Sequence, residues 1–318
     1  MCHLMNWASD VPPLFFSAAR TPEILCCEDQ TLKKILILMH ANQRRGRGLL
    51  IHALGKEWQD RGLQVLCQYG IERHPDADLL IPQIDLTRTP PEYGEYICSY
   101  SNVANRNVAD ISKRRVSDHL LRGDEDYHGP VVVKTDNNFG GLPECTRNEL
   151  WHLVLSRVME GIVLLAESAL GRHLAWRRVL RKYLVYNNMA EVPPGVFNNR
   201  ALVVERLLPE KQGNLYFVRH YIFLGDHARS IRMSGSTPIL KSSNSTLVDE
   251  GLPVPEEVLK LRREMGMDYG KIDYTICNDQ VIIIDVNRTP GAPASPARTA
   301  SDLAGGIWAL FPKAGATS

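Results

Sequence analysis

Two acids and an asparagine near the C-terminal end of the sequence are spaced so that they could bind a metal ion. Residues 281–284, Val-Ile-Ile-Ile, lead directly into Asp285, and Asn287 follows two residues later. Side chains two residues apart on a strand share one face of a sheet. A carboxylate after such an apolar run is costly to bury unless a charged group compensates it. With Asp273 as a third oxygen ligand, the set would suit Mg²⁺ bound to phosphates. From spacing alone, a surface hairpin with incidental acids is an equally good interpretation.

The length of the turn between the two strands decides whether Asp273 can join this set. Residues 271–277 and 280–286 are expected to form a hairpin. A two-residue turn would pair residue 273 with residue 284 and leave Asp285 on the opposite face. A three-residue loop over 278–280 would pair residue 273 with residue 285. A metal site therefore requires an odd-numbered loop, and we expect the three-residue one.

Lys134 and the loop after it form a second segment that could bind phosphate. The lysine ends a β-branched run, Val131-Val132-Val133, and the following residues 136–141 include two glycines. A lysine at a strand end can reach a phosphate as a point charge. Glycines let backbone N–H groups approach phosphate oxygens closely. Taken alone, a lysine followed by an ordinary turn is the better interpretation of this segment.

The N-terminal elements are predicted from hydrophobic periodicity. Residues 35–38 form a short apolar run that is typical of a strand buried on both faces. Apolar residues then recur at helical spacing from Leu49 to Trp58 and stop at Gly62. Residues 63–66 and 79–81 are two further candidate strands. This order predicts a small α/β domain with a largely parallel sheet, preceded by an irregular arm over residues 1–32.

The second half of the chain predicts two further α+β units. Residues 131–134, 201–204 and 216–223 are candidate strands, and residues 255–266 a short helix. Thr146 and Glu149 have the spacing of a capping box, so a long helix is expected from there to about residue 170. We expect the domains to span residues 33–112, 113–207 and 208–318, with a helical insertion over 147–200.

In combination, these segments resemble the ATP-grasp superfamily, which includes D-alanine–D-alanine ligase, glutathione synthetase and biotin carboxylase. The resemblance covers roughly residues 33–295. It is strongest at the C-terminal Lys-x-Asp…Asp-x-Asn-x-x-Pro-Gly, which is similar to the family's Arg-x-Asp…Glu-x-Asn-x-x-Pro-Gly. It implies that an N-terminal α/β domain precedes two α+β subdomains that enclose ATP. It also implies Mg²⁺, for which Mn²⁺ could substitute, at Asp273, Asp285 and Asn287, with Lys271 contacting phosphate.

The same resemblance assigns nucleotide contacts elsewhere in the chain. Lys113 and Lys134 would contact the nucleotide phosphates, and Glu205 would be the hinge acid beside adenine, with backbone contacts from Arg206 and Leu207. Glu210 lies about where a ribose-binding acid would be. The mobile phosphate loop would comprise Asp136, Asn137, Asn138, Phe139, Gly140 and Gly141. The chain departs from the family at Asp285, which replaces a glutamate, and in the short spacing between Lys113 and Lys134.

Composition restricts the partners and the compartment that we expect. Lysine plus arginine exceed aspartate plus glutamate by only one, 37 against 36, so no global field would attract nucleic acid. The basic run at residues 177–182 is best interpreted as a solvated helix face. No apolar run approaches the ~20 residues of a membrane-spanning helix. Seven cysteines without a CxxC pair suit reduced thiols. We therefore expect a cytoplasmic protein without nucleic-acid or membrane partners, and a homodimer is left open.

The activity that this resemblance implies is an ATP-dependent carboxylate–amine or carboxylate–thiol ligase, acting through an acylphosphate. Its partners would be a small-molecule carboxylate and an amine or similar nucleophile. Arg219 and Arg232, on the strands after the hinge, could anchor the carboxylate or the transferred phosphate, and surface or ion-paired arginines are an equally good interpretation. Two alternatives are a kinase of the same fold that phosphorylates a hydroxyl, and a non-catalytic nucleotide-binding protein. The sequence does not identify the substrates.

Overall fold

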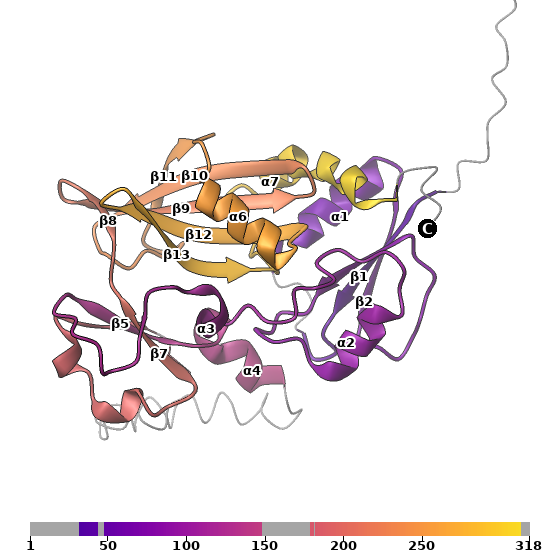
Figure 1. Cartoon of the computed structure of the whole chain (residues 1–318). Coiled ribbons are helices and arrows are strands. Elements are labelled where there is room, and N and C mark those ends of the chain that lie inside the picture. The colour runs from indigo at the N-terminus through magenta and orange to yellow at the C-terminus, as the bar shows by residue number, and fades with distance from the viewer. Residues whose placement is uncertain (1–31, 44–47, 148–178, 181, 313–318) are drawn as a thin grey trace, which may run out of the picture. The chain divides into compact units, whose positions relative to one another are not determined.

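Three β-sheets form the framework of the part of the chain that the computed structural model describes, residues 32–43, 48–147, 179–180 and 182–312 (Figure 1). The described residues between 32 and 312 pack together as one unit. The expected N-terminal arm, the expected helix beyond residue 147 and most of the basic run at 177–182 lie outside the described residues. Each of the expected segments 33–112, 113–207 and 208–318 contributes one of the sheets.

The first sheet is parallel, as the sequence predicts. Its strands are β1 (Lys34–Met39), β2 (Gln64–Tyr69) and β3 (Leu79–Gln83), in the order β2-β1-β3. Helix α1 (Leu50–Asp60) buries Leu50, Leu54 and Trp58, which are spaced four residues apart and so share one face. The Trp58 indole N–H donates to the Ala304 carbonyl at 3.1 Å, which ties this unit to the C-terminal end of the chain. Helix α2 (Pro91–Cys98) follows β3.

The second sheet is antiparallel and carries Lys134 and Glu205. Its strands are β4 (Leu120–Leu121), β5 (Val131–Thr135), β6 (Leu184–Tyr186) and β7 (Leu202–Arg206), in the order β4-β7-β5-β6. The short helices α3 (Lys113–Val116), η1 (Asn138–Gly141), α4 (Leu142–Arg147), η3 (Met189–Glu191) and η4 (Pro194–Val196) lie in its connections. The helix α4 already begins at Leu142-Pro143, and proline favours a first helical turn, so the predicted helix start at Thr146 is wrong. Glu149 of the expected capping box lies outside the described residues.

The third sheet carries the predicted metal ligands. Its strands are β8 (Glu210–Gln212), β9 (Leu215–Leu224), β10 (His227–Gly235), β11 (Thr246–Glu250), β12 (Tyr269–Cys277) and β13 (Gln280–Asn287). Their order is β11-β10-β9-β12-β13, with β8 paired to β9. The predicted helix α6 (Glu256–Met265) is confirmed, and it ends at Gly266 in a left-handed conformation with φ 63°. Helices α7 (Pro296–Leu303) and η5 (Ala304–Leu310) follow, and α7 packs beside α1 (Figure 1).

The two faces of the third sheet have different roles. On one face, Tyr221, Phe223, Ile272 and Tyr274 form a core with Val258 of α6, which crosses the sheet in Figure 1. The opposite face carries His220 and Ile222 on β9 and Lys271 and Asp273 on β12, all of which line a cavity. This division follows from the period of two along each strand.

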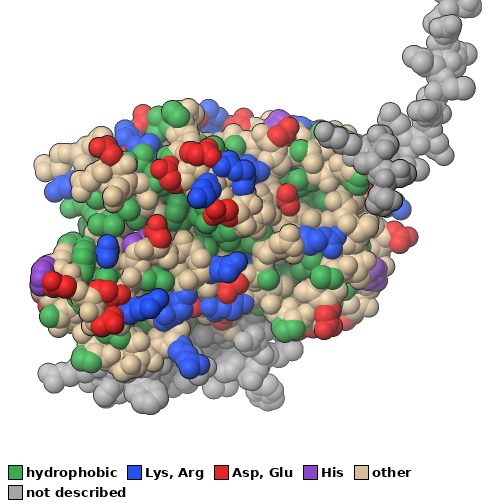
Figure 2. Space-filling view, viewed as in Figure 1, with side chains coloured by type: hydrophobic (Ala, Val, Ile, Leu, Met, Phe, Trp, Pro, Cys, Tyr) green, Lys and Arg blue, Asp and Glu red, His purple; other side chains and the backbone are tan. Residues whose placement is uncertain are grey.

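The described residues include no helix that is both long and apolar enough to cross a membrane. On the face shown in Figure 2, acidic and basic side chains are interspersed. This pattern agrees with the near-zero net charge of the sequence.

Candidate functional site

The hairpin of β12 and β13 brings Asp273 opposite Asp285, but by a route that the sequence did not predict. The turn contains only Asn278 and Asp279, with φ angles of 50° and 61°, and Cys277 pairs with Gln280. Such left-handed dihedrals are typical of a two-residue hairpin turn. The expected three-residue loop is therefore wrong. A β-bulge restores the parity, because Tyr274 pairs with Ile283 while Asp273 pairs with Asp285, so that Ile284 is the extra residue.

His220 and Lys271 hold the Asp273 carboxylate. His220 Nδ1 lies 2.5 Å from its Oδ1, and Lys271 Nζ lies 2.8 Å from its Oδ2. Burial alone would raise the pKa of the Asp273 carboxyl, but Lys271 and His220 outweigh burial and hold this pKa well below its usual range. Asp273 is therefore ionised at neutral pH, with both oxygens oriented.

Asp285 is in a less favourable environment for a carboxylate. Lys113 Nζ lies 3.5 Å from its Oδ1, and this ammonium also donates to Asn138 Oδ1 at 3.1 Å. Burial raises the pKa of the Asp285 carboxyl, Lys113 counteracts burial only in part, and the neighbouring Asp273 carboxylate raises the pKa further. The side chain of Asn287, the third expected ligand, accepts a hydrogen bond from the Thr289 N–H at 2.8 Å.

Lys134 and Glu205 form a buried ion pair between neighbouring strands β5 and β7. Lys134 Nζ lies 2.7 Å from Glu205 Oε2, and His119 Nε2 lies 3.6 Å from the same oxygen. Burial would raise the pKa of the Glu205 carboxyl, but Lys134 and His119 outweigh it and lower the pKa to about 2. Glu205 Oε1 has no hydrogen-bonding partner among the described residues. Such an arrangement keeps both charges in place at low dielectric.

The predicted phosphate loop is held by polar contacts. Asp136 is buried and accepts from Arg88 Nη2 at 2.7 Å and from the Arg114 N–H at 2.9 Å. The Asn138 N–H donates to Thr87 Oγ1 at 2.8 Å, and Asn138 Nδ2 donates to the Val286 carbonyl at 2.8 Å. Asn138 thus links the loop directly to β13. The Asp136 carboxylate instead holds the loop against Arg88 and the backbone of Arg114.

Gly140 could not be replaced by a larger residue without a shift of the backbone. Its φ is +68°, and a Cβ built on it would lie 2.3 Å from the Leu180 carbonyl oxygen. The Leu180 N–H donates to the Gly140 carbonyl at 3.0 Å. The glycine is therefore required by the close approach of two backbones.

Most of the predicted phosphate and metal residues line one cavity of about 710 Å³. The predicted residues among its lining are Lys134, Asn138, Phe139, Gly140, Lys271, Asp273, Asp285 and Asn287. Lys113 and Glu205 do not line it, but each contacts a residue that does. Asp136, Asn137 and Gly141 lie outside the lining. The cavity thus combines lysines that can neutralise phosphates with carboxylates that can bind a cation.

The predicted roles of Arg219, Arg232 and Glu210 are not supported by their positions. All three lie outside the cavity lining, and Arg219 and Arg232 are register partners on β9 and β10. Arg219 donates to both oxygens of Glu210, at 2.8 and 2.9 Å, and Arg232 Nη1 lies 3.5 Å from Glu210 Oε1. Because their neighbours His220 and Ile231 face the cavity, strand alternation directs both arginines to the other face. The arginines neutralise Glu210 there.

The hinge backbone is also engaged within the chain. The Arg206 N–H donates to the His119 carbonyl at 3.1 Å, and the Leu207 N–H donates to the Pro130 carbonyl at 2.9 Å. The Arg206 guanidinium lies 5.2 Å from the centre of the Tyr127 ring. The predicted adenine contacts through these two N–H groups would therefore require a rearrangement of the hinge.

The sequence patterns did not indicate several residues that lie in or beside the cavity. His220 contacts Asp273, and Tyr183 lies with its ring centre 5.5 Å from Lys134 Nζ. Burial, followed by the charge of Asp285, raises the pKa of Tyr183 to about 12. Arg229 and Arg298 also line the cavity. Side chains alternate between the two faces along β9 and β10. If the face of one residue on each strand were known, this alternation would assign His220 and Arg229 to one face and Arg219 and Arg232 to the other.

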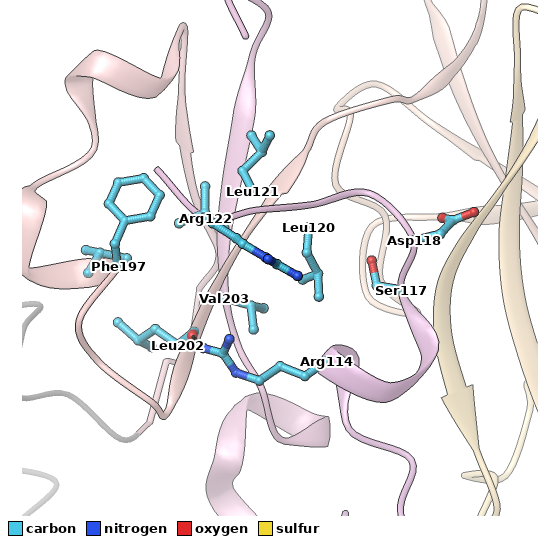
Figure 3. A pocket seen from close by; sticks show the side chains of 11 residues that line it. Arg114, Ser117, Asp118, Leu120, Leu121, Arg122, Phe197, Leu202 and Val203 are labelled. Atoms are coloured by element: carbon cyan, nitrogen blue, oxygen red, sulfur yellow. Dashed lines mark hydrogen bonds between the residues drawn. The ribbon is translucent and has the colours of Figure 1, made fainter. Parts of the chain in front are cut away.

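A second cavity, of about 480 Å³, opens beside the second sheet (Figure 3). It is lined by Arg114, Ser117, Asp118, Leu120, Leu121, Arg122, Val196, Phe197, Leu202, Val203 and Val204. Arg114 Nη2 donates to the Leu202 carbonyl at 2.7 Å. None of the residues predicted to bind nucleotide or metal lines it.

The donors near β13 fit a divalent cation that arrives with phosphates. No group of three or more His, Cys, Asp or Glu side chains among the described residues is arranged to hold a metal ion. Two carboxylates and an amide would leave most coordination positions to phosphate and water oxygens, as Mg²⁺ prefers. Burial and, to a smaller extent, the Asp273 carboxylate raise the pKa of the Asp285 carboxyl, and a cation bound beside it would favour its ionised form. The residues present therefore fit Mg²⁺ or Mn²⁺, bound together with a nucleotide.

Comparisons with known proteins give structural similarities only. The sequence matches no family model, and no curated protein matches it. A RimK-domain ATP-grasp protein from Sphaerobacter thermophilus is 12% identical, with a TM-score of 0.46 over 87% of this chain and 99% of that one. D-alanine–D-alanine ligase from Bacillus anthracis is 12% identical, with a TM-score of 0.45 over 87% of this chain and 95% of that one.

The ATP-grasp ligase PsnB, in complex with a variant precursor, Mg and ADP, is 8% identical, with a TM-score of 0.48 over 87% of this chain and 99% of that one. No activity follows from identities and TM-scores this low. Over most of its length, the chain is similar in structure to ATP-grasp proteins.

Proposed function

We propose that this chain is an ATP-dependent ligase of the ATP-grasp superfamily, which activates a carboxylate as an acylphosphate for attack by an amine or thiol. The observation that carries the proposal is the shared cavity of Lys134, Lys271, Asp273 and Asp285, residues that are up to 151 positions apart in the sequence. Lysines and acids that converge on one cavity are suited to a polyphosphate and its divalent cation.

Each group in the cavity has a separate role in this reaction. Lys134 and Lys271 would neutralise phosphate oxygens. Lys113, which contacts Asp285 and does not line the cavity, would add positive charge near the same phosphates. Asp273 and Asp285, with Asn287, would hold the cation that neutralises charge during transfer. His220 and Lys271 orient Asp273 through one oxygen each. Glu205 holds the Lys134 ammonium until a phosphate competes for it.

Trapping with hydroxylamine tests the proposal directly. The carboxylate oxygen attacks the γ-phosphorus of ATP, which yields ADP and an acylphosphate. Hydroxylamine then attacks the acyl carbon, so that inorganic phosphate leaves and a hydroxamate remains. We expect carboxylate-dependent formation of ADP and hydroxamate by the full chain. ATP consumption without hydroxamate, with phosphate retained on the product, would instead identify a kinase.

A matched pair of lysine variants links this activity to the cavity. Lys271→Met should lower the rate of hydroxamate formation by at least about 100-fold, because a preorganised positive charge at the transferred group is lost. Lys260→Met removes a lysine from the exposed face of α6, where Lys260 Nζ lies 3.7 Å from Glu264, and should leave the rate unchanged. Binding of ATP without turnover by any acceptor would support a non-catalytic role.

A further inference from the structure

Charged and apolar side chains occupy different parts of the cavity face of the third sheet. One cross-strand row runs from Asp285 on β13 through Asp273 on β12 and His220 on β9 to Ile231 on β10. The next row on this face runs from Asn287 through Lys271 to Ile222. The candidate phosphate and metal ligands therefore lie on β12 and β13, whereas Arg229, the partner of Ile222, and Glu250, the partner of Ile231, form a second charged group on β10 and β11.

Beside these charged groups, this face carries an apolar surface. We call it the apolar wall, and it consists of Ile222, Ile231, Met233, Leu240 and Leu247, all of which line the cavity. Met233 and Leu247 are register partners on β10 and β11. Residues from two other segments, Leu49, Leu50, Pro290, Ala292, Pro293 and Ala294, line the same cavity. The bridge between Leu49 and Gly291 joins these two segments.

The charges beside the apolar wall neutralise one another. Arg229 Nη2 and Arg298 Nη2 lie 2.9 and 2.7 Å from the two oxygens of Glu250. Arg229 Nη1 lies 3.3 Å from Asp302 Oδ2 and donates to Thr299 Oγ1 at 2.9 Å. Two arginines thus face two carboxylates, with the donors of Arg229 already engaged. A second carboxylate of a substrate would have to compete with Glu250 for these arginines. Lys241 also lines the cavity, with its Nζ 5.1 Å from the centre of the Tyr183 ring.

We propose that the acceptor of this ligase is a monocarboxylic acid with an uncharged, apolar body that lies on the apolar wall and directs its carboxylate toward His220. This inference rests on the proposed function. Asp273 and Ile231 are two strand spacings apart, which is about 10 Å. A carbon chain of medium size spans this distance. Water displaced from the apolar wall would favour such a body.

A homologous series of acids tests the inference. Acetate, butyrate, hexanoate and octanoate are compared in the hydroxylamine assay, with octanedioate as the diacid matched in length to octanoate. We expect kcat/KM to rise about fourfold for each added methylene until the cavity is filled. The diacid should be at least about tenfold poorer than octanoate. A flat series, or preference for the diacid, overturns the inference.

Variants of the apolar wall provide the second test. Met233→Gln keeps the length of the side chain but adds an amide, and should raise the KM for octanoate at least about tenfold without changing the affinity for ATP. Val248→Gln places the same amide on an exposed bulge residue of β11 that does not line the cavity, and should have no effect. Equal effects of the two variants would contradict the proposed role of the wall.

Calorimetric titration with octanoate, in the presence of ADP and Mg²⁺, tests the inference without turnover. Binding to the wild type that is lost in Met233→Gln supports the apolar wall, and absence of octanoate binding overturns it. Failure of the proposed function has a different signature, because the protein would then bind no ATP or consume it without forming hydroxamate from any acid.

Discussion

Asp273 and Asp285 face each other across β12 and β13, although the turn between these strands contains only two residues. The bulge at Ile284 shifts the register by one residue and so places both carboxylates on the cavity side. The two acids are not equivalent. Lys271 and His220 overcome the effect of burial and lower the pKa of Asp273, whereas burial raises the pKa of Asp285.

Neutralising Asp285 should therefore separate activity from stability. A carboxyl whose pKa is raised on folding destabilises the fold at pH values above that raised pKa. In Asp285→Asn we expect turnover to fall by orders of magnitude, while the melting temperature without Mg²⁺ at pH 7 stays the same or rises by roughly 1–3 °C. Asp279→Asn makes the same charge change in the exposed turn and should affect neither quantity. Normal turnover in Asp285→Asn would show that this carboxylate binds no catalytic cation.

The Lys134–Glu205 pair should behave as a buried ion pair in a double-mutant cycle. Glu205→Gln leaves the Lys134 ammonium without its partner at 2.7 Å, and should lower the free energy of unfolding by roughly 3 kcal/mol. Lys134→Met combined with Glu205→Gln should recover much of that loss, because no unpaired charge remains. Chemical denaturation of the two single variants and the double variant measures the coupling. Additive losses would mean that the two side chains do not stabilise each other.

The ionisation of the Glu205 carboxyl should also contribute to the pH dependence of stability. The folded pKa of Glu205 is about 2, below the ordinary value of 4.5, because Lys134 and His119 outweigh burial. Its contribution is present above about pH 4.5 and is lost as the pH falls toward 2. Glu205→Gln should therefore show a shallower loss of stability between pH 5 and 2 than the wild type, by roughly 3 kcal/mol in total. Glu257→Gln, at an exposed position of α6, is the control and should keep the wild-type slope.

The contact of His220 with Asp273 predicts a difference between two variants. His220→Asn can still donate from a position close to that of Nδ1, whereas His220→Leu cannot. We expect the Mg²⁺ concentration for half-maximal ATP turnover to rise about 10- to 100-fold in His220→Leu and to change little in His220→Asn. Equal Mg²⁺ requirements in the two variants would mean that the hydrogen bond does not orient the ligand.

Arg219 should matter for stability and not for substrate binding. Arg219→Gln removes the hydrogen bonds from Arg219 to both oxygens of the buried Glu210, and should cost roughly 2–3 kcal/mol of unfolding free energy. The KM values for ATP and for the acceptor should stay within about twofold of the wild type, because the arginine lies outside the cavity lining. A large rise in KM with unchanged stability would restore the carboxylate-anchoring role that the sequence suggested.

Local patterns in the sequence determined the elements that position the site. The apolar run at 35–38, the four-residue spacing from Leu50 to Trp58 and the β-branched run before Lys134 each predicted an element that is present. The alternation of Asp285 and Asn287 placed both on one face, as found. These predictions succeeded because burial on one face of a helix or sheet restricts residues only a few positions apart.

Only the tertiary structure decided which side chains meet in the cavity. With a two-residue turn and no bulge, Asp285 would lie on the opposite face from Asp273. The bulge at Ile284 brings both to the same face, and the residue type at that position does not predict a bulge. The pairing of β9 with β12 placed His220 beside Asp273 and turned Arg219 away. The partners in the site contacts are separated by up to 172 positions, as Lys113 and Asp285 are, so no local pattern connects them. Strand order and register fix such contacts, and both depend on how the whole sheet buries its apolar face.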